Sequence, residues 1–144
     1  MKADANEKLL LSTLNIGRII KEQMHNDKEL CNFSRAEMEA LNYVKNNNIS
    51  TMRSIAGYLH IKPPSVTALI ENLEKKGNIK KAKSHTDKRE ICVKITPKGN
   101  RLLKTKHDNI QKSIKKIFKT LSNKDKQALV QIFEKIIKNY DENK

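Results

Sequence analysis

Two neighbouring segments near the middle of the chain carry apolar residues at helical spacing. In each segment these residues fall at positions i, i+3, i+4 and i+7, so each predicted helix buries one face. The first stripe consists of Met52, Ile55, Ala56 and Leu59, and the second of Val66, Leu69, Ile70 and Leu73. Only residues 60–62 separate the two segments, which leaves room for a sharp turn and nothing longer. The pattern therefore predicts a helix-turn-helix.

Backbone-restricting residues mark both ends of the second helix. Pro63 suits its first position because the missing N–H would have no helical partner there, and Gly77 can adopt the positive φ that ends a helix. Beyond Gly77 the apolar period changes from 3.6 to 2, because Ile91, Val93 and Ile95 alternate with polar or small residues. Residues 78–83 can pair with this segment, which predicts a β-hairpin with its tip at residues 84–90.

The predicted hairpin is strongly basic. Residues 75–94 contain eight Lys or Arg and only two acids, and the tip holds His85, Lys88 and Arg89. Phosphate is the natural counterpart of such a surface, since neutralising it releases counterions. The hairpin is therefore a candidate wing beside a DNA-binding helix.

The order and spacing of these motifs resemble the MarR (multiple antibiotic resistance) family of winged helix-turn-helix regulators. The matching motifs are SVT at 65–67, LEKKG at 73–77, DKR at 87–89 and ITPKG at 95–99, within a block that covers about a third of the chain. The resemblance implies a mainly α fold with a small β-hairpin wing. It also implies a homodimer whose N- and C-terminal helices form a dimerisation region.

Long amphipathic patterns flank the central block on both sides, the first of them between residues 6 and 28. Each later helix begins with a start signature: Ser34 with Glu37, Thr96 with Pro97, and Ser122 with Asp125. The terminal helices carry more apolar surface than one small domain can cover, so we expect them to pack against a second copy. We expect residues 1–33 and 97–144 to form the dimerisation region, intertwined with a DNA-binding region at 34–96.

Composition narrows the class of protein. The length of 144 residues suits one domain, and the net charge of +14 resides entirely beyond residue 50, because residues 1–50 contain seven basic and seven acidic side chains. Two cysteines in no metal or redox spacing, no Gly-rich loop and no nucleophile motif argue against an enzyme, a cofactor or a metal site. The N-terminal stretch lacks a basic signal-peptide region, so we expect a cytoplasmic protein.

The second helix supplies the first group of candidate DNA-binding residues. Opposite its apolar stripe lie Pro64, Thr67, Ala68 and Glu71, with Ser65 at the edge of this face and Lys75 near the end of the helix. In a major groove, hydroxyl groups bond phosphates or base edges, and methyl groups contact thymine methyls. We expect Ser65 and Thr67 to be the main contacts. The alternative is an ordinary solvated helix face.

The wing supplies the second group. Lys88 and Arg89, with His85, are candidates for minor-groove or flanking-phosphate contacts, because a narrow minor groove attracts Arg. Asp87 is expected to orient a neighbouring Arg rather than to touch DNA. The alternative is a solvated run of charges. Cys31, just before the helix that starts at Ser34, is a candidate oxidant sensor, against the alternative of an ordinary surface cysteine.

These inferences predict a homodimeric, sequence-specific transcriptional regulator, more specifically a repressor, bound to a pseudo-palindromic double-stranded operator with half-sites about one helical turn apart. The family resemblance implies a small aromatic effector held between the dimerisation helices and the winged region. The alternative function is a winged-helix module that binds protein or RNA without sequence-specific DNA recognition. With three Phe, three Tyr and no Trp, the chain is poor in aromatic platforms for stacking single-stranded bases.

Overall fold

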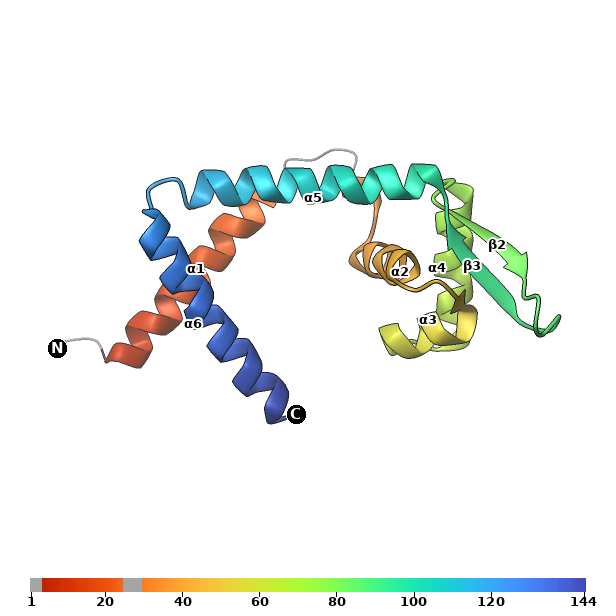
Figure 1. Ribbon diagram of the computed structural model, residues 1–144, viewed down its shortest axis with the longest axis horizontal. Helices are drawn as coiled ribbons and strands as arrows, with labels where there is room; N and C mark the ends of the chain where they lie inside the picture. Colours follow the sequence, from red (N-terminus) through yellow and green to blue (C-terminus); the bar gives the residue numbers. More distant parts are fainter. Residues whose placement is uncertain (1–3, 25–29) are drawn as a thin grey trace. The chain divides into compact units, whose positions relative to one another are not determined.

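The computed structural model describes residues 4–24 and 30–144, and most of their helices and strands are labelled in Figure 1. The elements are α1 (Ala5–Met24), the 3₁₀-helix η1 (Leu30–Asn32), α2 (Arg35–Asn46), β1 (Ser50–Thr51), α3 (Met52–Leu59), α4 (Pro63–Lys75), β2 (Ile79–Lys83), β3 (Ile91–Ile95), α5 (Pro97–Ile117) and α6 (Asn123–Glu142). Two compact units result. Of the described residues, 30–109 form one unit, and 4–24 together with 110–144 form the other.

The predicted helix-turn-helix is confirmed as α3 and α4. Ile55 of α3 packs in one core with Val66, Ile70 and Leu73 of α4, all four at most 2% exposed. His60 ends α3 in the left-handed conformation with φ of 53°, an uncommon state for a residue other than glycine. Helix α4 begins at Pro63 as predicted, and no side chain caps its first turn.

The predicted hairpin is present as β2 and β3, and it belongs to a three-stranded antiparallel sheet with the order β1-β3-β2. The third strand, β1, pairs Ser50 with Val93 and was not predicted, because two residues are too short to show a period. Helices α2, α3 and α4 pack with the inward side chains of this sheet, such as Val93. The mainly α fold with a small β wing is confirmed.

A close-packed junction joins α4, the wing and α5. Gly77 follows α4 with φ of 77°, and its carbonyl accepts a hydrogen bond from the Thr96 hydroxyl at 2.6 Å. The same hydroxyl oxygen accepts the N–H of Gly99 at 3.1 Å, which caps the start of α5. A Cβ added at Gly99 would overlap the carbonyl oxygen of Asn78. The base of the wing is therefore fixed to the first turn of α5.

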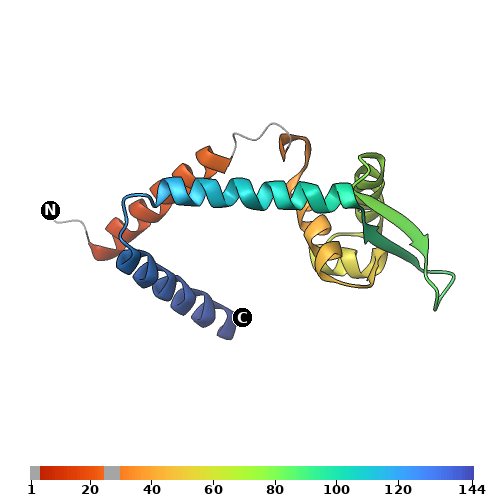
Figure 2. The same ribbon diagram turned by 45° about the horizontal axis from the view of Figure 1, so that its top comes forward.

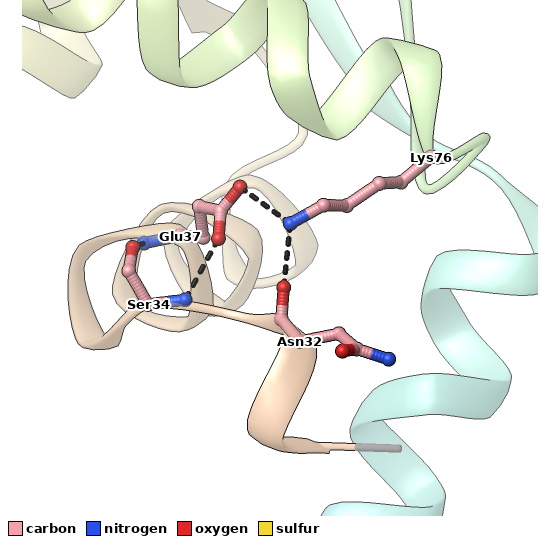
Figure 3. A network of polar contacts seen from close by, with 4 residues as sticks. All are labelled: Asn32, Ser34, Glu37 and Lys76. Atoms are coloured by element: carbon pink, nitrogen blue, oxygen red, sulfur yellow. Dashed lines mark hydrogen bonds and ion pairs between the residues drawn. The ribbon is translucent and has the colours of Figure 1, made fainter. Parts of the chain in front are cut away.

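A buried carboxylate links the start of α2 to the end of α4 (Figure 3). Glu37, 6% exposed, accepts the backbone N–H of Ser34 at 2.7 Å and the Lys76 ammonium at 2.9 Å. The Lys76 ammonium also donates to the Asn32 carbonyl at 2.7 Å and lies 4.4 Å from the centre of the Phe33 ring. The predicted capping box of Ser34 and Glu37 is confirmed, and it gains a long-range ion pair.

These contacts control the pKa of Glu37. Burial raises the pKa of this carboxyl group, but the hydrogen bonds from Lys76 and Ser34, together with the positive charge of Lys76, lower it by more. The net pKa therefore lies below the ordinary value for glutamate. The folded state favours the ionised carboxylate.

In the other unit, α1 and α6 contain no buried residue. Both helices expose large apolar side chains: Leu9, Leu10, Leu11, Leu14, Ile16 and Met24 in α1, and Val130, Ile132, Phe133, Ile136, Ile137 and Tyr140 in α6. The Ser113 hydroxyl of α5 donates to the Gln23 carbonyl at 3.4 Å, a contact between α5 and the end of α1. Apolar surface of this extent on a folded unit marks an interaction surface.

Replacing Glu37 by Gln should lower the free energy of unfolding at neutral pH by about 1 to 3 kcal/mol, because the half-buried Lys76 ammonium loses its buried anionic partner. A lowered folded pKa means that this stabilisation is complete above the unfolded pKa and is lost as the pH falls through the folded one. The gap between the wild type and Glu37→Gln, measured by urea unfolding, should therefore shrink in acid. Glu39→Gln is the control, because its pair with Arg35 is exposed and should contribute little. A gap that stays constant with pH would contradict the prediction.

Candidate nucleic-acid interface

The exposed face of α4 holds all the residues that the sequence predicted there. Pro64, Ser65, Thr67 and Ala68 are exposed within its first two turns, and Lys75 is exposed at its last residue. The Thr67 hydroxyl donates to the Pro63 carbonyl at 3.0 Å, so its oxygen lone pairs and its methyl group remain for an outside partner. The first half of α4 thus offers hydroxyl and methyl groups and no charge.

The wing loop holds itself in shape with short backbone bonds. The Ser84 N–H donates to the Glu90 carbonyl at 2.9 Å, and the Glu90 N–H donates to the Asp87 carbonyl at 3.0 Å. The Ser84 hydroxyl oxygen accepts the N–H groups of Thr86 and Asp87 at 3.3 and 3.4 Å. Figures 1 and 2 show this loop at the far end of the hairpin, beyond the helices of its unit.

His85, Lys88 and Arg89 are all exposed in this loop. The Asp87 carboxylate accepts the backbone N–H of Arg89 at 2.9 Å. Within the described part of the chain, Asp87 forms no ion pair with the Arg89 guanidinium. Asp87 therefore fixes the backbone from which the Arg89 side chain projects. That these loop residues touch DNA stays a prediction.

Charge on the outer face of the hairpin is concentrated rather than paired. The strand register sets Lys80 directly opposite Lys94, and both side chains are exposed. Like charges at opposed positions repel each other and destabilise the strand pair. An anionic partner lying across this face would remove that repulsion. The arrangement is suited to a chain of phosphates.

Sequence reasoning missed a contact between α4 and the wing. The Glu74 carboxylate accepts the backbone N–H of Lys81 at 3.0 Å, and its second oxygen lies 3.7 Å from the Lys81 ammonium. No periodicity or sequence motif predicts a hydrogen bond between a helix side chain and the backbone of a strand. The only sequence feature of this contact is an acidic residue directly before a basic segment, and that feature is too common to be specific.

A cationic cavity lies in the same unit, near the start of α5. Its volume is about 870 Å³, and it is lined by Asn32, Phe33, Lys76, Asn78, Lys98, Arg101, Leu102 and Thr105. Three of these residues are basic and none is acidic. Both polar side-chain atoms of Asn78 are buried, and no described residue offers them a hydrogen bond. The cavity combines positive charge, an aromatic ring and an amide in need of a partner.

Other expected features concern chemistry outside this interface. Cys31 is exposed in η1. Across residues 4–24 and 30–144, no three His, Cys, Asp or Glu side chains gather where they would hold a metal ion. Among the helices of that same part, none has the length and apolar character that a membrane crossing requires.

Comparison with known proteins places the chain among transcriptional regulators. The family model described as transcriptional regulator SarA/Rot matches residues 22–110, more than half of the chain. A curated relative, the uncharacterized HTH-type transcriptional regulator YfiV of Bacillus subtilis, is 25% identical over 96 residues. That match covers 67% of this chain and 60% of the relative, so the chain spans less than two thirds of the relative's length.

Solved structures share the fold over nearly the whole chain. The YusO protein from Bacillus subtilis superposes with a TM-score of 0.83 at 19% identity, covering 94% of this chain and 99% of that one. A variant of MepR from S. aureus, a MarR-family regulator, was solved bound to an oligodeoxyribonucleotide. It gives a TM-score of 0.72 at 19% identity, covering 92% and 97% of the two chains. The fold of this chain is that of the MarR-type winged helix-turn-helix regulators.

Proposed function

This chain belongs to the SarA/Rot family of transcriptional regulators, and we propose that it acts by binding sequence-specific sites on double-stranded DNA as a homodimer. The main support is that two different surfaces are exposed on one compact unit. The start of α4 carries hydroxyl groups and no charge, and the basic wing loop is held in shape by hydrogen bonds within the loop. A helix of this kind suits base edges in a major groove, and such a wing suits phosphates or the minor groove. The DNA complex of the MepR variant, which shares the fold, supports the proposal.

The proposal assigns distinct roles to the two surfaces. Ser65 and Thr67, with Pro64 and Ala68, read base edges and thymine methyl groups, and Lys75 binds phosphate. In the wing, Arg89 enters or flanks the minor groove, while Lys88 and His85 bind the backbone. The exposed Lys80–Lys94 pair extends the phosphate-binding surface, because DNA relieves its repulsion.

Arg89→Ala should cost about 1 to 3 kcal/mol of DNA affinity, and Lys88→Ala should mainly reduce the slope of log affinity against log salt by about one. Affinities of both variants and the wild type are measured on a selected duplex over a series of salt concentrations. Lys144→Ala is the control, because that lysine lies at the end of the chain beyond α6. Equal affinities of all four proteins at every salt concentration would remove the wing from DNA binding.

The alternative function is a module that binds protein or RNA. A competition experiment distinguishes the two functions. The protein is bound to a selected duplex, and the fraction displaced by excess random duplex or by RNA is measured at fixed salt. The regulator function requires that random duplex and RNA compete far more weakly than the selected site, since specific binding is typically ~10³-fold or more tighter. Equal competition by all nucleic acids would favour the module.

We also propose that residues 1–33 and 97–144 form the dimerisation region around the DNA-binding region 34–96. The support is the apolar faces of α1 and α6, whose large side chains are 39% to 68% exposed in the described part of the chain. In a two-fold dimer the apolar faces of one subunit would cover those of the other. A substitution on such a face then occurs twice in the interface, once in each subunit. The two α4 helices then reach half-sites on a pseudo-palindromic operator.

Ile136→Asp should weaken the dimer at least ~10-fold, because it puts a charge on an apolar face whose burial contributes roughly 1.5 to 3 kcal/mol per large side chain. Sedimentation equilibrium measures the dissociation constant. Gln131→Asp adds the same charge at an exposed polar position of α6 and should leave the dimer intact. A wild-type chain that sediments as a monomer would contradict the dimer proposal.

We propose further that the protein is a repressor released by a small anionic aromatic effector in the cavity near the start of α5. Lys98 and Arg101 would attract a carboxylate, Phe33 would contact its ring, and a polar group that reached Asn78 would satisfy its amide. Oxidation of the exposed Cys31 is the alternative signal. In both cases the ligand or modification acts by favouring a state that binds DNA less well.

Benzoate at millimolar concentration should weaken DNA binding, and benzyl alcohol, which has the ring without the charge, should not. Arg101→Ala should reduce the response to benzoate several-fold while the affinity for DNA without benzoate changes less, since Arg101 lies outside α4 and the wing. Hydrogen peroxide with the wild type and Cys31→Ser tests the oxidant signal in the same assay. A response to benzoate that is identical in Arg101→Ala would exclude this cavity as the effector site.

A further inference from the structure

One carboxylate ties the wing to the last turn of α4. Strand β2 is an edge strand, because the sheet order is β1-β3-β2. The outward N–H of Lys81 in this strand therefore has no partner strand, and it donates instead to Glu74 at 3.0 Å. The other Glu74 oxygen lies 3.7 Å from the ammonium of the same lysine. Glu74 thus holds one strand residue by its backbone and its side chain together.

We infer that Glu74 is a positioning residue for DNA binding, which sets the wing at a fixed distance and angle from the reading face of α4. This inference rests on the proposed function. Glu74 sits within α4, and Lys81 lies three residues before the wing loop begins at Ser84. Anything that loosens the Glu74–Lys81 contact lets the basic loop move relative to Ser65 and Thr67.

Fixing the wing matters because α4 and the wing engage one duplex together. When the first surface binds, the second meets its groove at an effective concentration set by the stiffness of the connection. A loosely attached wing lowers that concentration and must lose more freedom on binding. Glu74 therefore raises affinity without touching DNA.

The charge of Glu74 predicts an effect of the opposite sign. An acid near a polyanion repels it, so removal of Glu74 should by electrostatics alone tighten DNA binding. If the Glu74–Lys81 contact, here called the tether, positions the wing, loss of the Glu74 side chain should weaken DNA binding. The sign of the change in affinity thus decides between a positioning residue and an ordinary surface acid.

The test compares Glu74→Ala, Glu74→Gln and Glu71→Ala, each with an intact wing and in a Lys88→Ala/Arg89→Ala background. Gln keeps an oxygen that can accept the Lys81 N–H but carries no charge. Glu71 is an exposed acid on the same helix, and among the described residues it has no bond to β2, so its removal takes away a negative charge and leaves the Lys81 contact in place. Binding to a duplex selected by the wild type is measured at low salt, so that wing-deficient proteins still bind. The rate of hydrogen exchange of the Lys81 amide, measured by NMR without DNA, shows whether the Glu74–Lys81 hydrogen bond is present in solution.

With the wing intact, Glu74→Ala should bind about five- to tenfold more weakly, the equivalent of one lost hydrogen bond of about 1 kcal/mol. Glu74→Gln should retain most of the affinity, and Glu71→Ala should bind as well as the wild type or better. In the wing-deficient background, Glu74→Ala should change affinity less than about twofold. Exchange of the Lys81 amide should speed up in Glu74→Ala and stay slow in Glu74→Gln.

Tighter or unchanged binding by Glu74→Ala, or an equal loss in both backgrounds, would overturn the inference. Unchanged exchange of the Lys81 amide in Glu74→Ala would overturn it as well, because the tether would then be absent in solution. A wild type that selects no duplex from a random pool would overturn the proposed function instead. That outcome is recognisable because it appears before any variant is compared.

Discussion

The buried stripe of α4 is the constraint on which the rest of the interface depends. Val66, Ile70 and Leu73 are almost fully buried, and they lock the rotation of the helix about its own axis. Burial of three such side chains contributes several kcal/mol, roughly 1.5 to 3 each. Since the stripe can face only the core, Ser65 and Thr67 can face only outward. The packing of the buried stripe therefore decides which side chains of α4 are exposed.

The rotation of α4 about its axis does not by itself determine where the wing lies. Further contacts at the base of the hairpin hold the wing in place. Gly77 turns the chain out of α4, Thr96 bonds both Gly77 and Gly99, and the tight contact of Gly99 with Asn78 leaves no room for a larger residue. The Glu37–Lys76 pair then holds the end of α4 against the start of α2. Most of these links join residues far apart in the sequence, and together they tie the wing, the end of α4, the start of α2 and the first turn of α5 to one another.

Elements with a period or a terminal signature could be predicted from the sequence, and contacts between elements could not. The stripes of α3 and α4, the alternation of β3 and the capping boxes at Ser34 and Ser122 all depend on residues close in the chain. Strand β1 is too short for a pattern, and the bonds of Glu37 to Lys76 and of Glu74 to Lys81 need the fold to bring their partners together. The exposure of the candidate residues of α4 could be predicted because it follows from the helical period, and that of the wing tip because it lies between two strands. The cavity could not be predicted, because residues from several elements form it.

The acids of the basic hairpin explain how so much positive charge coexists with a defined shape. Glu74 and Asp87 both accept backbone N–H groups, from Lys81 and Arg89, so these carboxylates order the chain rather than neutralise its surface. Among the described residues 79–95, which form the two strands and their loop, Lys81 is the single cation with an ion pair. Lys80, Lys83, Lys88, Arg89 and Lys94 therefore keep their charges for an outside partner. A hairpin selected for stability alone would pair those charges across its strands, and this one sets two lysines face to face. The repulsion is tolerable because the bonds at the base of the wing hold the strands, and in the proposed complex with DNA the phosphates would relieve it.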